Sequence, residues 1–213
     1  MLSSGDTHLA YPFTVRNSGS LWCIPDASFT GVVRAHRVSA PHDAWDDGFV
    51  LLHDVPAADP TVIEYDGRWW LFCTRHDDAP SVNLHVFHAP TLRGPWSPHS
   101  ANPVKSDVRS SRPAGTPFIV AGVLHRPAQD CSRAYGGAVT INRVMGLTPT
   151  RFVEEVAAVV PPDPSYPDGL HTLSAFGDRT LVDGRRRVWA PMKPFRRLVG
   201  RATDIASRAS RHG

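Results

Sequence analysis

Short apolar runs separated by turn residues recur along the chain and predict β-hairpins. In residues 11–24 an apolar run is followed by Asn17-Ser18-Gly19 and then by an aromatic-rich run. Residues 59–72 repeat this order, with Asp66-Gly67 between the two runs. Turns of this composition supply the positive φ values that two-residue hairpin loops require. Each segment is therefore predicted to form a strand, a tight turn and a second strand.

Two more degraded copies of the same pattern follow, at residues 116–126 and 171–185. Pro12, Pro60 and Pro117 mark the starts of the first three copies. The copies recur at intervals of about 50 residues, a period typical of propeller blades. The chain is therefore interpreted as an internal repeat of one small sheet.

Alternating apolar and polar residues between the hairpins predict further half-buried strands, for instance at residues 82–88 and 138–142. Each repeat then contains about four strands. A blade of this size cannot bury both faces alone, so neighbouring blades have to stack around an axis. We predict an all-β fold, a β-propeller of about four blades over residues 1–190. A β-sandwich built from the same strands is the alternative.

The end of the chain has a different pattern. Residues 185–213 carry nine Lys or Arg and one acid, whereas the rest of the chain is acidic overall. Apolar residues recur at helical spacing within 191–213, which predicts a short amphipathic basic helix. Such a tail can fray, lie on the propeller, or make a weak contact with an anionic membrane or a protein. Because the body is acidic, we expect no nucleic-acid partner.

Composition excludes several other classes of protein. The 41% apolar, 9% aromatic and 20% charged residues are close to globular averages. No apolar run reaches the roughly 18 residues of a membrane span, and no export signal opens the chain, so we expect a cytoplasmic protein. Cys23, Cys73 and Cys131 lie far apart without a C-x-x-C motif and are expected to be buried thiols. Neither metal-ligand spacing nor a phosphate loop is present, so no metal or cofactor is expected.

Several motifs together carry a family resemblance, although each is short. They include His8-Leu9-Ala10-Tyr11-Pro12-Phe13, Ala58-Asp59-Pro60-Thr61, Gly94-Pro95-Trp96-Ser97-Pro98-His99, Ser111-Arg112-Pro113-Ala114-Gly115 and Gly169-Leu170-His171-Thr172. From about His8 to Asp183 the chain resembles the N-terminal domain of plant glucosamine inositolphosphorylceramide transferase and its bacterial relatives. That domain in turn resembles the five-bladed propellers of arabinanase-, xylosidase- and fructosidase-type glycoside hydrolases.

The resemblance implies a sugar site in the central channel of the propeller. It also implies an earlier blade with a Trp-Ala-Asp-Pro-Phe motif, which we expect to be missing here. A fragment, a misplaced start codon and a ring of four blades remain open as explanations. Asp59 resembles the carboxylate with which related hydrolases tune the acid and orient the sugar, while Arg112 stands where they place the acid.

Candidate site residues are those expected to reach the channel. Two carboxylates are catalytic candidates, namely Asp59 and Asp130. The substrate-binding candidates are His8, Tyr11, Trp70, Arg112, Gln129, Tyr135 and His171. They combine planar polar groups for sugar hydroxyls with aromatic faces for stacking. Glu154 and Glu155, on an apparent strand, are expected to face solvent.

These features predict a propeller of the glycosyltransferase-associated type that recognises or processes a carbohydrate or glycoconjugate. The alternatives are an inverting glycoside hydrolase and a truncated, inactive remnant. Inverting hydrolysis requires an acid and a base about 6.5–9.5 Å apart. Because the general-base blade is absent and no acid is obvious, sugar recognition requires fewer specific residues of this sequence than hydrolysis does.

Overall fold

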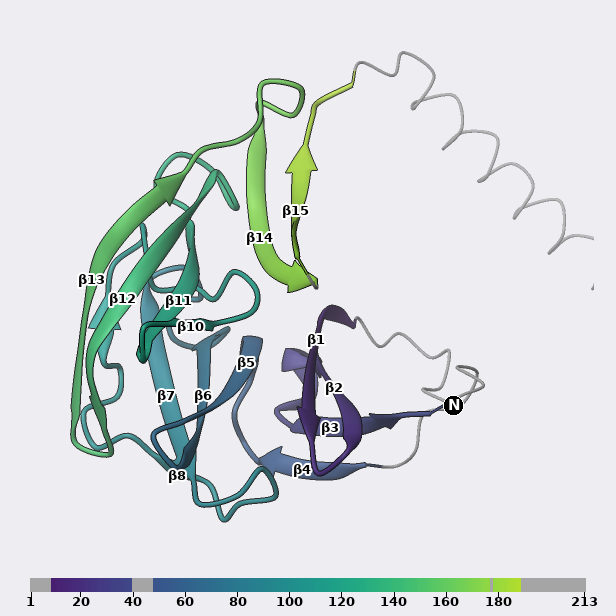
Figure 1. Cartoon of the computed structure of the whole chain (residues 1–213), viewed down its shortest axis with the longest axis vertical. Helices are drawn as coiled ribbons and strands as arrows, with labels where there is room; N and C mark the ends of the chain where they lie inside the picture. Colours follow the sequence, from purple (N-terminus) through teal and green to yellow (C-terminus); the bar gives the residue numbers. More distant parts are fainter. Residues whose placement is uncertain (1–8, 40–47, 177, 189–213) are drawn as a thin grey trace, which may run out of the picture.

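The computed structural model describes residues 9–39, 48–176 and 178–188, which form four antiparallel sheets (Figure 1). The first sheet contains, in spatial order, β1 (Ala10–Asn17), β2 (Ser20–Asp26), β3 (Val33–Val38) and β4 (Phe49–Leu52). The second contains β5 (Ala57–Tyr65), β6 (Arg68–Arg75), β7 (Asn83–Ala89) and β8 (Ser97–Pro98), and β9 (Lys105–Ser106) also pairs with β7. A 3-10 turn, Ser28–Thr30, lies between β2 and β3.

The third and fourth sheets follow in chain order around the same centre (Figure 1). The third contains β10 (Phe118–Val120), β11 (Val123–Asp130), β12 (Ala138–Thr148) and β13 (Arg151–Val160). The fourth is a two-stranded sheet of β14 (Gly169–Phe176) and β15 (Arg179–Arg185). Within each sheet sequential strands are neighbours, except that β9 pairs with β7, so an all-β architecture of successive small sheets is confirmed.

The predicted hairpin turns have the conformation that their sequences favour. Ser18 and Gly19 have φ values of 48° and 74°, and Asp66 and Gly67 have φ values of 51° and 68°. Two consecutive positive φ values are the signature of a type I′ turn, whose twist matches that of the flanking strands. The same pair of positive values occurs at residues 121–122, between β10 and β11. Local turn chemistry therefore sets three of the four hairpins.

Three apolar clusters lie between neighbouring sheets. One joins the first and second sheets, with Ile24 and Leu71 fully buried in it. Another packs Phe72 of the second sheet with Leu124 of the third. The smallest packs strand β12 with Leu170 of β14. Consecutive sheets thus share apolar contacts, although every residue of β15 in the fourth sheet is exposed.

A buried ion network crosses the third sheet and corrects one expectation from the sequence. The prediction that Glu154 faces solvent is wrong, because its side chain is 1% exposed. Its carboxylate accepts hydrogen bonds from Nε and Nη2 of Arg126, at 3.0 and 2.6 Å, and from Nζ of Lys105 at 2.8 Å. The next residue, Glu155, does face solvent and pairs with Arg143. Strand alternation places the two acids on opposite faces of β13.

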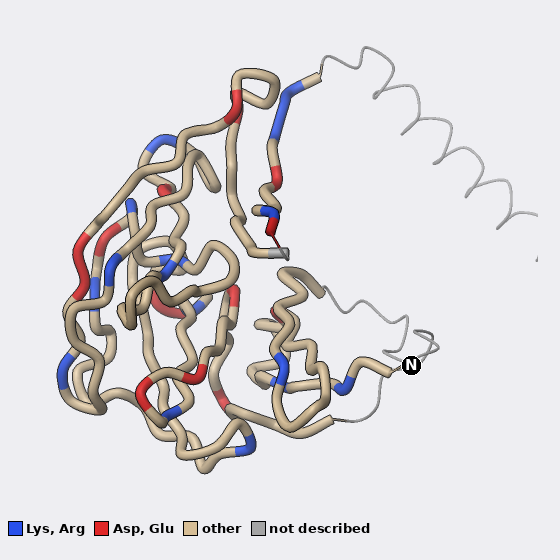
Figure 2. The backbone as a smooth tube through the Cα atoms, in the orientation of Figure 1, with Lys and Arg blue, Asp and Glu red and all other residues tan. Residues whose placement is uncertain are grey.

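Charge is mixed over the described strands, where acidic and basic residues are interspersed (Figure 2). The predicted basic helix falls at 191–213, outside the described residues. No helix in the part of the chain that the structure describes has the length and apolar character needed to cross a membrane.

Candidate functional site

The first strand of three sheets carries an extra residue at the same place. Pairing with the second strand shifts register at residues 11–12 of β1, 59–60 of β5 and 171–172 of β14. Such bulges bend the strand and redirect a side chain. The bulged segments begin with Tyr11, Asp59 and His171, three of the predicted site residues. Tyr11 and Asp59 also have unusual positive φ values of 44° and 52°, which are held by the surrounding structure.

Asp59 is the centre of a buried polar cluster, which we call the Asp59 cluster. Its Oδ2 accepts hydrogen bonds from Nε of Arg112 at 2.6 Å and from Nε2 of Gln129 at 2.9 Å. Asp59 is 3% exposed, and Arg112 and Gln129 are also buried. The backbone N–H of Asp59 donates to Oδ2 of Asp26 at 3.2 Å. Gln129 of the third sheet and Arg112 therefore meet at the Asp59 carboxylate, while Asp26 of the first sheet binds the backbone of Asp59.

The cluster perturbs both of its ionisable groups. Burial raises the pKa of Asp59, and the charge and hydrogen bond of Arg112 oppose this shift. Burial lowers the pKa of Arg112, but the neighbouring Asp59 raises it further, so the net shift is upward and the guanidinium stays charged. A paired, buried carboxylate of this kind orients its partners rather than exchanging protons with solvent.

The Tyr11 hydroxyl group connects the first sheet to the second sheet and to the segment that precedes β10. The Tyr11 hydroxyl oxygen accepts a hydrogen bond from the backbone N–H of Gly115 at 2.6 Å and lies 2.9 Å from Oγ1 of Thr61. Burial raises the pKa of the Tyr11 phenol. Gly115 has a φ of 112°, and a Cβ there would lie 2.0 Å from the carbonyl oxygen of Leu173. Only glycine permits this approach between the segment that precedes β10 and strand β14.

Tyr135 and His171 connect the Asp59 cluster to the surface. The guanidinium carbon of Arg112 lies 4.8 Å from the centroid of the Tyr135 ring, and the Tyr135 and His171 rings are 5.3 Å apart. Nδ1 of His171 contacts Oδ2 of Asp183. The other carboxylate oxygen of Asp183 accepts hydrogen bonds from the backbone N–H groups of His171, at 3.0 Å, and Thr172, at 2.6 Å. These contacts fix the orientation of the imidazole.

A pocket of about 430 Å³, which we call the Tyr135 pocket, opens beside these two rings. Its lining residues are Tyr135, Gly136, Gly169, His171, Asp183, Gly184, Arg185 and Arg186. A Cβ at position 136 would lie 2.5 Å from Cβ of His171, so this glycine lets the two sheets approach. The pocket offers an aromatic face, an oriented imidazole and cationic groups. Such a combination suits a polar ligand with hydroxyl groups.

Sequence reasoning missed Asp183 and the two arginines that line the pocket. In the sequence, Asp183-Gly184 lies within the fourth copy of the repeat, at residues 171–185. Its partner His171 lies twelve residues earlier in the chain. The only indication in the sequence was the predicted hairpin of residues 171–185, because a hairpin places the strand of His171 beside the strand of Asp183.

Other predicted site residues lie apart from the Tyr135 pocket. Trp70 is 2% exposed within the core between the second and third sheets, and its Nε1 donates to the carbonyl of Tyr65. Asp130 follows Gln129 on the opposite face of β11, and its Oδ1 accepts the backbone N–H of Ser132 at 2.9 Å. His8 lies outside the described residues. Asp59, Arg112 and Gln129 support the pocket from behind Tyr135 and do not line it.

Metal ligation finds no support within residues 9–39, 48–176 and 178–188. No group of three or more His, Cys, Asp or Glu side chains there is arranged to hold an ion.

Comparison of the sequence with known proteins points to one family. The family described as "Glucosamine inositolphosphorylceramide transferase 1, N-terminal" matches residues 2–163. Glucosamine inositolphosphorylceramide transferase 1 of Oryza sativa subsp. japonica is 34% identical over 152 residues, which cover 69% of this chain and 20% of the relative. The Arabidopsis thaliana protein of the same name is 26% identical over 152 residues, with the same coverage. The match thus spans about a fifth of these relatives.

Comparison of structures finds glycoside hydrolases. The exo-β-1,3-galactanase 1,3Gal43A of Clostridium thermocellum has a TM-score of 0.52 at 12% identity, covering 71% of this chain and 37% of that one. A Bacteroides ovatus xyloglucan-locus protein, GH43B, has a TM-score of 0.51 at 16% identity, covering 83% and 35%. These neighbours are five-bladed propellers, so the likeness shows the fold of the present sheets.

Proposed function

Because the chain belongs to the family of glucosamine inositolphosphorylceramide transferase N-terminal domains, we propose that it binds a carbohydrate or glycoconjugate in the Tyr135 pocket. The resemblance inferred from the sequence motifs is thereby confirmed. In this proposal the four described sheets are successive blades of a propeller, and the pocket lies at their shared centre.

One observation carries the proposal above all others. Three sheets place a bulge at the same point of their first strand, and each bulge begins with a polar or aromatic site residue. Packing between sheets needs only apolar faces, so it does not require these side chains to converge. Two of these residues, Asp59 and His171, are connected through Arg112 and Tyr135 to a single pocket, which is what a ligand site needs.

The pocket supplies the groups that bind sugars in proteins. Tyr135 is 46% exposed and presents a rigid aromatic face for the C–H side of a sugar ring. His171 and Asp183 are half-exposed and offer polar atoms for hydroxyl groups. Arg112 holds the Tyr135 ring from behind by a cation–π contact, so the face is already oriented before binding.

Recognition is better supported than hydrolysis. Inverting hydrolysis requires one carboxyl group as acid and another as base across the bond. Here Asp59 is buried with Arg112 and Gln129, Asp130 caps its own turn, and Asp183 holds His171. In the described part of the site, each candidate carboxylate is thus engaged in positioning another group.

The names of the relatives guide the choice of ligands. The curated relatives are named for transfer of glucosamine to inositolphosphorylceramide, and a structural neighbour is named for cleaving β-1,3-linked galactan. We propose that the chain contributes recognition of a glycan or glycolipid headgroup to an activity of that class.

A glycan array tests the proposal directly. The array should include glucosamine-terminated and β-1,3-galactose-terminated glycans, and the full chain should retain at least one of them. Tyr135→Ala should reduce the affinity at least about tenfold, because a central aromatic contact is lost. Phe29→Ala is the matched control, since Phe29 is an exposed aromatic residue outside the pocket.

Folding has to be checked alongside binding, so the melting temperature of each variant is measured. Retention that survives Tyr135→Ala, or no retention by the unaltered chain, would overturn the proposal. If the chain releases reducing sugar from the retained glycan, its function is hydrolysis and not recognition alone.

A further inference from the structure

The second strand of the repeat is covered in three sheets and exposed in the fourth. Strands β2, β6 and β11 have only buried or half-buried side chains. Strand β15 takes the same place in the fourth sheet, yet all seven of its residues are exposed. Leu181 and Val182 are both 52% exposed, whereas Ile24 of β2 and Leu71 of β6 are fully buried. The fourth sheet therefore lacks the cover that the repeat has elsewhere.

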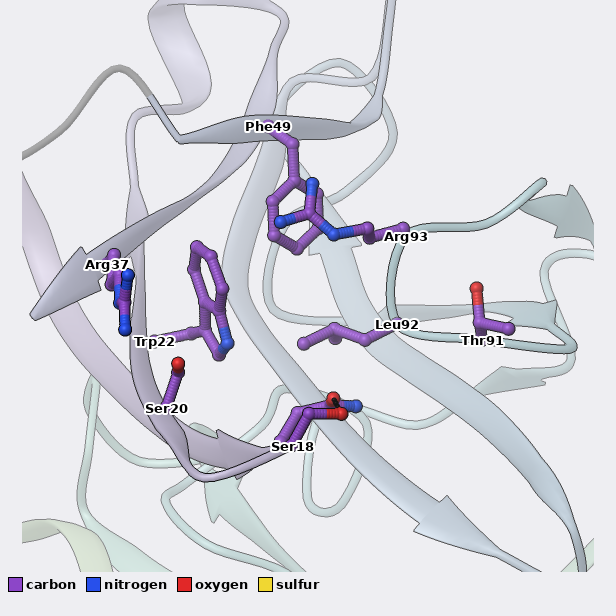
Figure 3. A pocket seen from close by; sticks show the side chains of 9 residues that line it. Ser18, Ser20, Trp22, Arg37, Phe49, Thr91, Leu92 and Arg93 are labelled. Carbon is purple, nitrogen blue, oxygen red and sulfur yellow. Dashed lines mark hydrogen bonds between the residues drawn. The ribbon is translucent and has the colours of Figure 1, made fainter.

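The first sheet shows what this cover consists of. Trp22 of β2 contacts Phe49 of β4 edge to face, with ring centroids 4.9 Å apart. From the loop between β7 and β8, the guanidinium carbon of Arg93 lies 4.2 Å from the Phe49 centroid and 5.4 Å from that of Trp22. Figure 3 shows these side chains around a pocket of about 520 Å³. Later strands of the same sheet and a loop of the next sheet thus cover β2.

Strand β15 has no further strand beside it in the part of the chain that the structure describes (Figure 1). It pairs with β14, and Arg185 at its end forms a single bridge with Pro167. An edge of this kind presents backbone N–H and C=O groups to another strand. A sheet of two strands is also only marginally stable by itself. Both observations point to a strand that pairs with β15.

The sequence of β15 is complementary to itself about Leu181. Two copies of β15 that pair antiparallel about a two-fold axis at Leu181 place Arg179 opposite Asp183 of the second copy, on both sides of the axis. Opposite charges on facing strands stabilise the pairing. A register centred on Val182 would instead place Arg179 opposite the second copy's Arg185. Within the described residues, Arg179 has no ion-pair partner of its own.

We propose that β15 is a self-association surface, through which two copies of this chain join their fourth sheets into one sheet of order β14-β15-β15-β14. Pairing gives the fourth sheet four strands, the number in the first and third sheets. It also brings Arg179 of the second copy to the rim of the Tyr135 pocket, because Asp183 lines that pocket. The dimer therefore carries two Tyr135 pockets beside one axis, whatever ligand they bind.

Sedimentation equilibrium of the full chain measures the association. Contact between two seven-residue strands is smaller than a standard interface, so we expect a weak dimer that forms at about 100 μM and dissociates at about 1 μM. Arg179→Asp places like charges opposite each other and should raise the dissociation constant at least about tenfold. Arg151→Asp makes the same charge reversal at an exposed position of β13 and should leave the constant unchanged.

Introduced cysteines test the register of the pairing. Leu181→Cys faces its own copy across the axis, so mild oxidation should link the two chains by a disulfide. Directly opposite residues have Cβ atoms about 4.5–5.5 Å apart, which is close to the separation that a disulfide needs. Val182→Cys faces Thr180 of the second copy and should link far more slowly. Both variants also carry Cys131→Ser, which removes the half-buried native thiol.

Several results would overturn the proposal. They are a full chain that stays monomeric at about 100 μM, unchanged association of Arg179→Asp, and equally fast linking at positions 181 and 182. Hydrogen exchange identifies a different occupant, because alternate amides of a free edge have no partner strand. Protection of every amide of β15 in a monomer would assign the edge to a segment of the same chain and would also overturn self-association. Tyr135→Ala should not change the dissociation constant, so failure of the glycan proposal is distinguishable.

Discussion

The buried pair of Arg126 and Glu154 leads to a sharp prediction about stability. Arg126 is fully buried, and its guanidinium group donates to both carboxylate oxygens of Glu154 and to the carbonyls of Ser110 and Ser111. Glu154→Gln keeps the shape of the side chain and removes its charge. The guanidinium of Arg126 then stays buried without a counter-charge. Lys105 also loses the charge of its hydrogen-bond partner.

The expected cost follows from this geometry. Removing one partner of a buried ion pair typically costs about 3–5 kcal/mol, because the remaining charge keeps its desolvation penalty. For a chain of this size each kcal/mol lowers the melting temperature by about 2–4 °C. Glu154→Gln should therefore lower the melting temperature by about 6–20 °C.

The neighbouring acid of the same strand is a matched control. Glu155 pairs with Arg143 at 2.8 Å, but its side chain is 57% exposed. Exposed pairs are worth less than about 1 kcal/mol, so Glu155→Gln should have a small effect. Urea unfolding followed by tryptophan fluorescence and thermal melting followed by circular dichroism measure both variants.

A double variant tests the reason for the loss. Arg126→Met combined with Glu154→Leu removes both charges of the pair and should recover part of the stability that Glu154→Gln loses, because the fully buried guanidinium is gone and only Lys105, whose side chain is 19% exposed, is left without its partner. Equal unfolding midpoints for Glu154→Gln and Glu155→Gln would refute the reasoning. A double variant less stable than Glu154→Gln would show that the charge is not the source of the cost.

Three further predictions concern backbone, pH and thiols. Gly115→Ala should destabilise the fold more than Gly122→Ala in urea, because a Cβ at 115 meets backbone atoms whereas one at 122 meets open space. Burial raises the pKa of Asp183, but hydrogen bonds from the neighbouring imidazole and backbone outweigh it and hold the pKa below its ordinary value. The Asp183 carboxylate therefore contributes its full stabilisation at pH values above its ordinary pKa, and this stabilisation is lost as the pH falls through the lowered pKa of the folded state. Asp183→Asn should therefore reduce the dependence of the unfolding free energy on pH below about pH 4. In the native state a disulfide reagent should react only with half-buried Cys131, because Cys23 and Cys73 are buried and burial raises the pKa of Cys73. In urea all three thiols should react. Fast labelling of Cys73 in the native state would contradict its buried position.

Local chemistry explains why the repeat was recognisable in the sequence. Type I′ turns at residues 18–19 and 66–67 need residues that accept positive φ, and these stand out between apolar runs. Strands built from such hairpins follow from short-range patterns alone. The X-Pro pairs at residues 11–12 and 59–60 mark the starts of the first two repeats in the sequence, and both coincide with bulges in the structure.

Contacts between sheets were beyond the sequence pattern. Glu154 was expected in solvent because an acid on a half-polar strand usually is, yet Arg126 and Lys105 approach it from other segments. Likewise nothing near Asp183 in sequence indicates that it holds the imidazole of His171. Such partners come from distant parts of the chain, and the pattern of apolar and polar residues along one strand does not indicate which distant residue will contact it.

The primary sequence by itself determined the β-hairpins, their repeat and the family, because turn preferences and alternation act over a few residues. Only the tertiary structure decided that Asp59 is shared by Arg112 and Gln129, and that Arg93 stacks on Phe49. Those contacts arise when separate sheets pack around a common centre. Packing, rather than local conformational preference, therefore assigns the polar side chains of this protein to their sites.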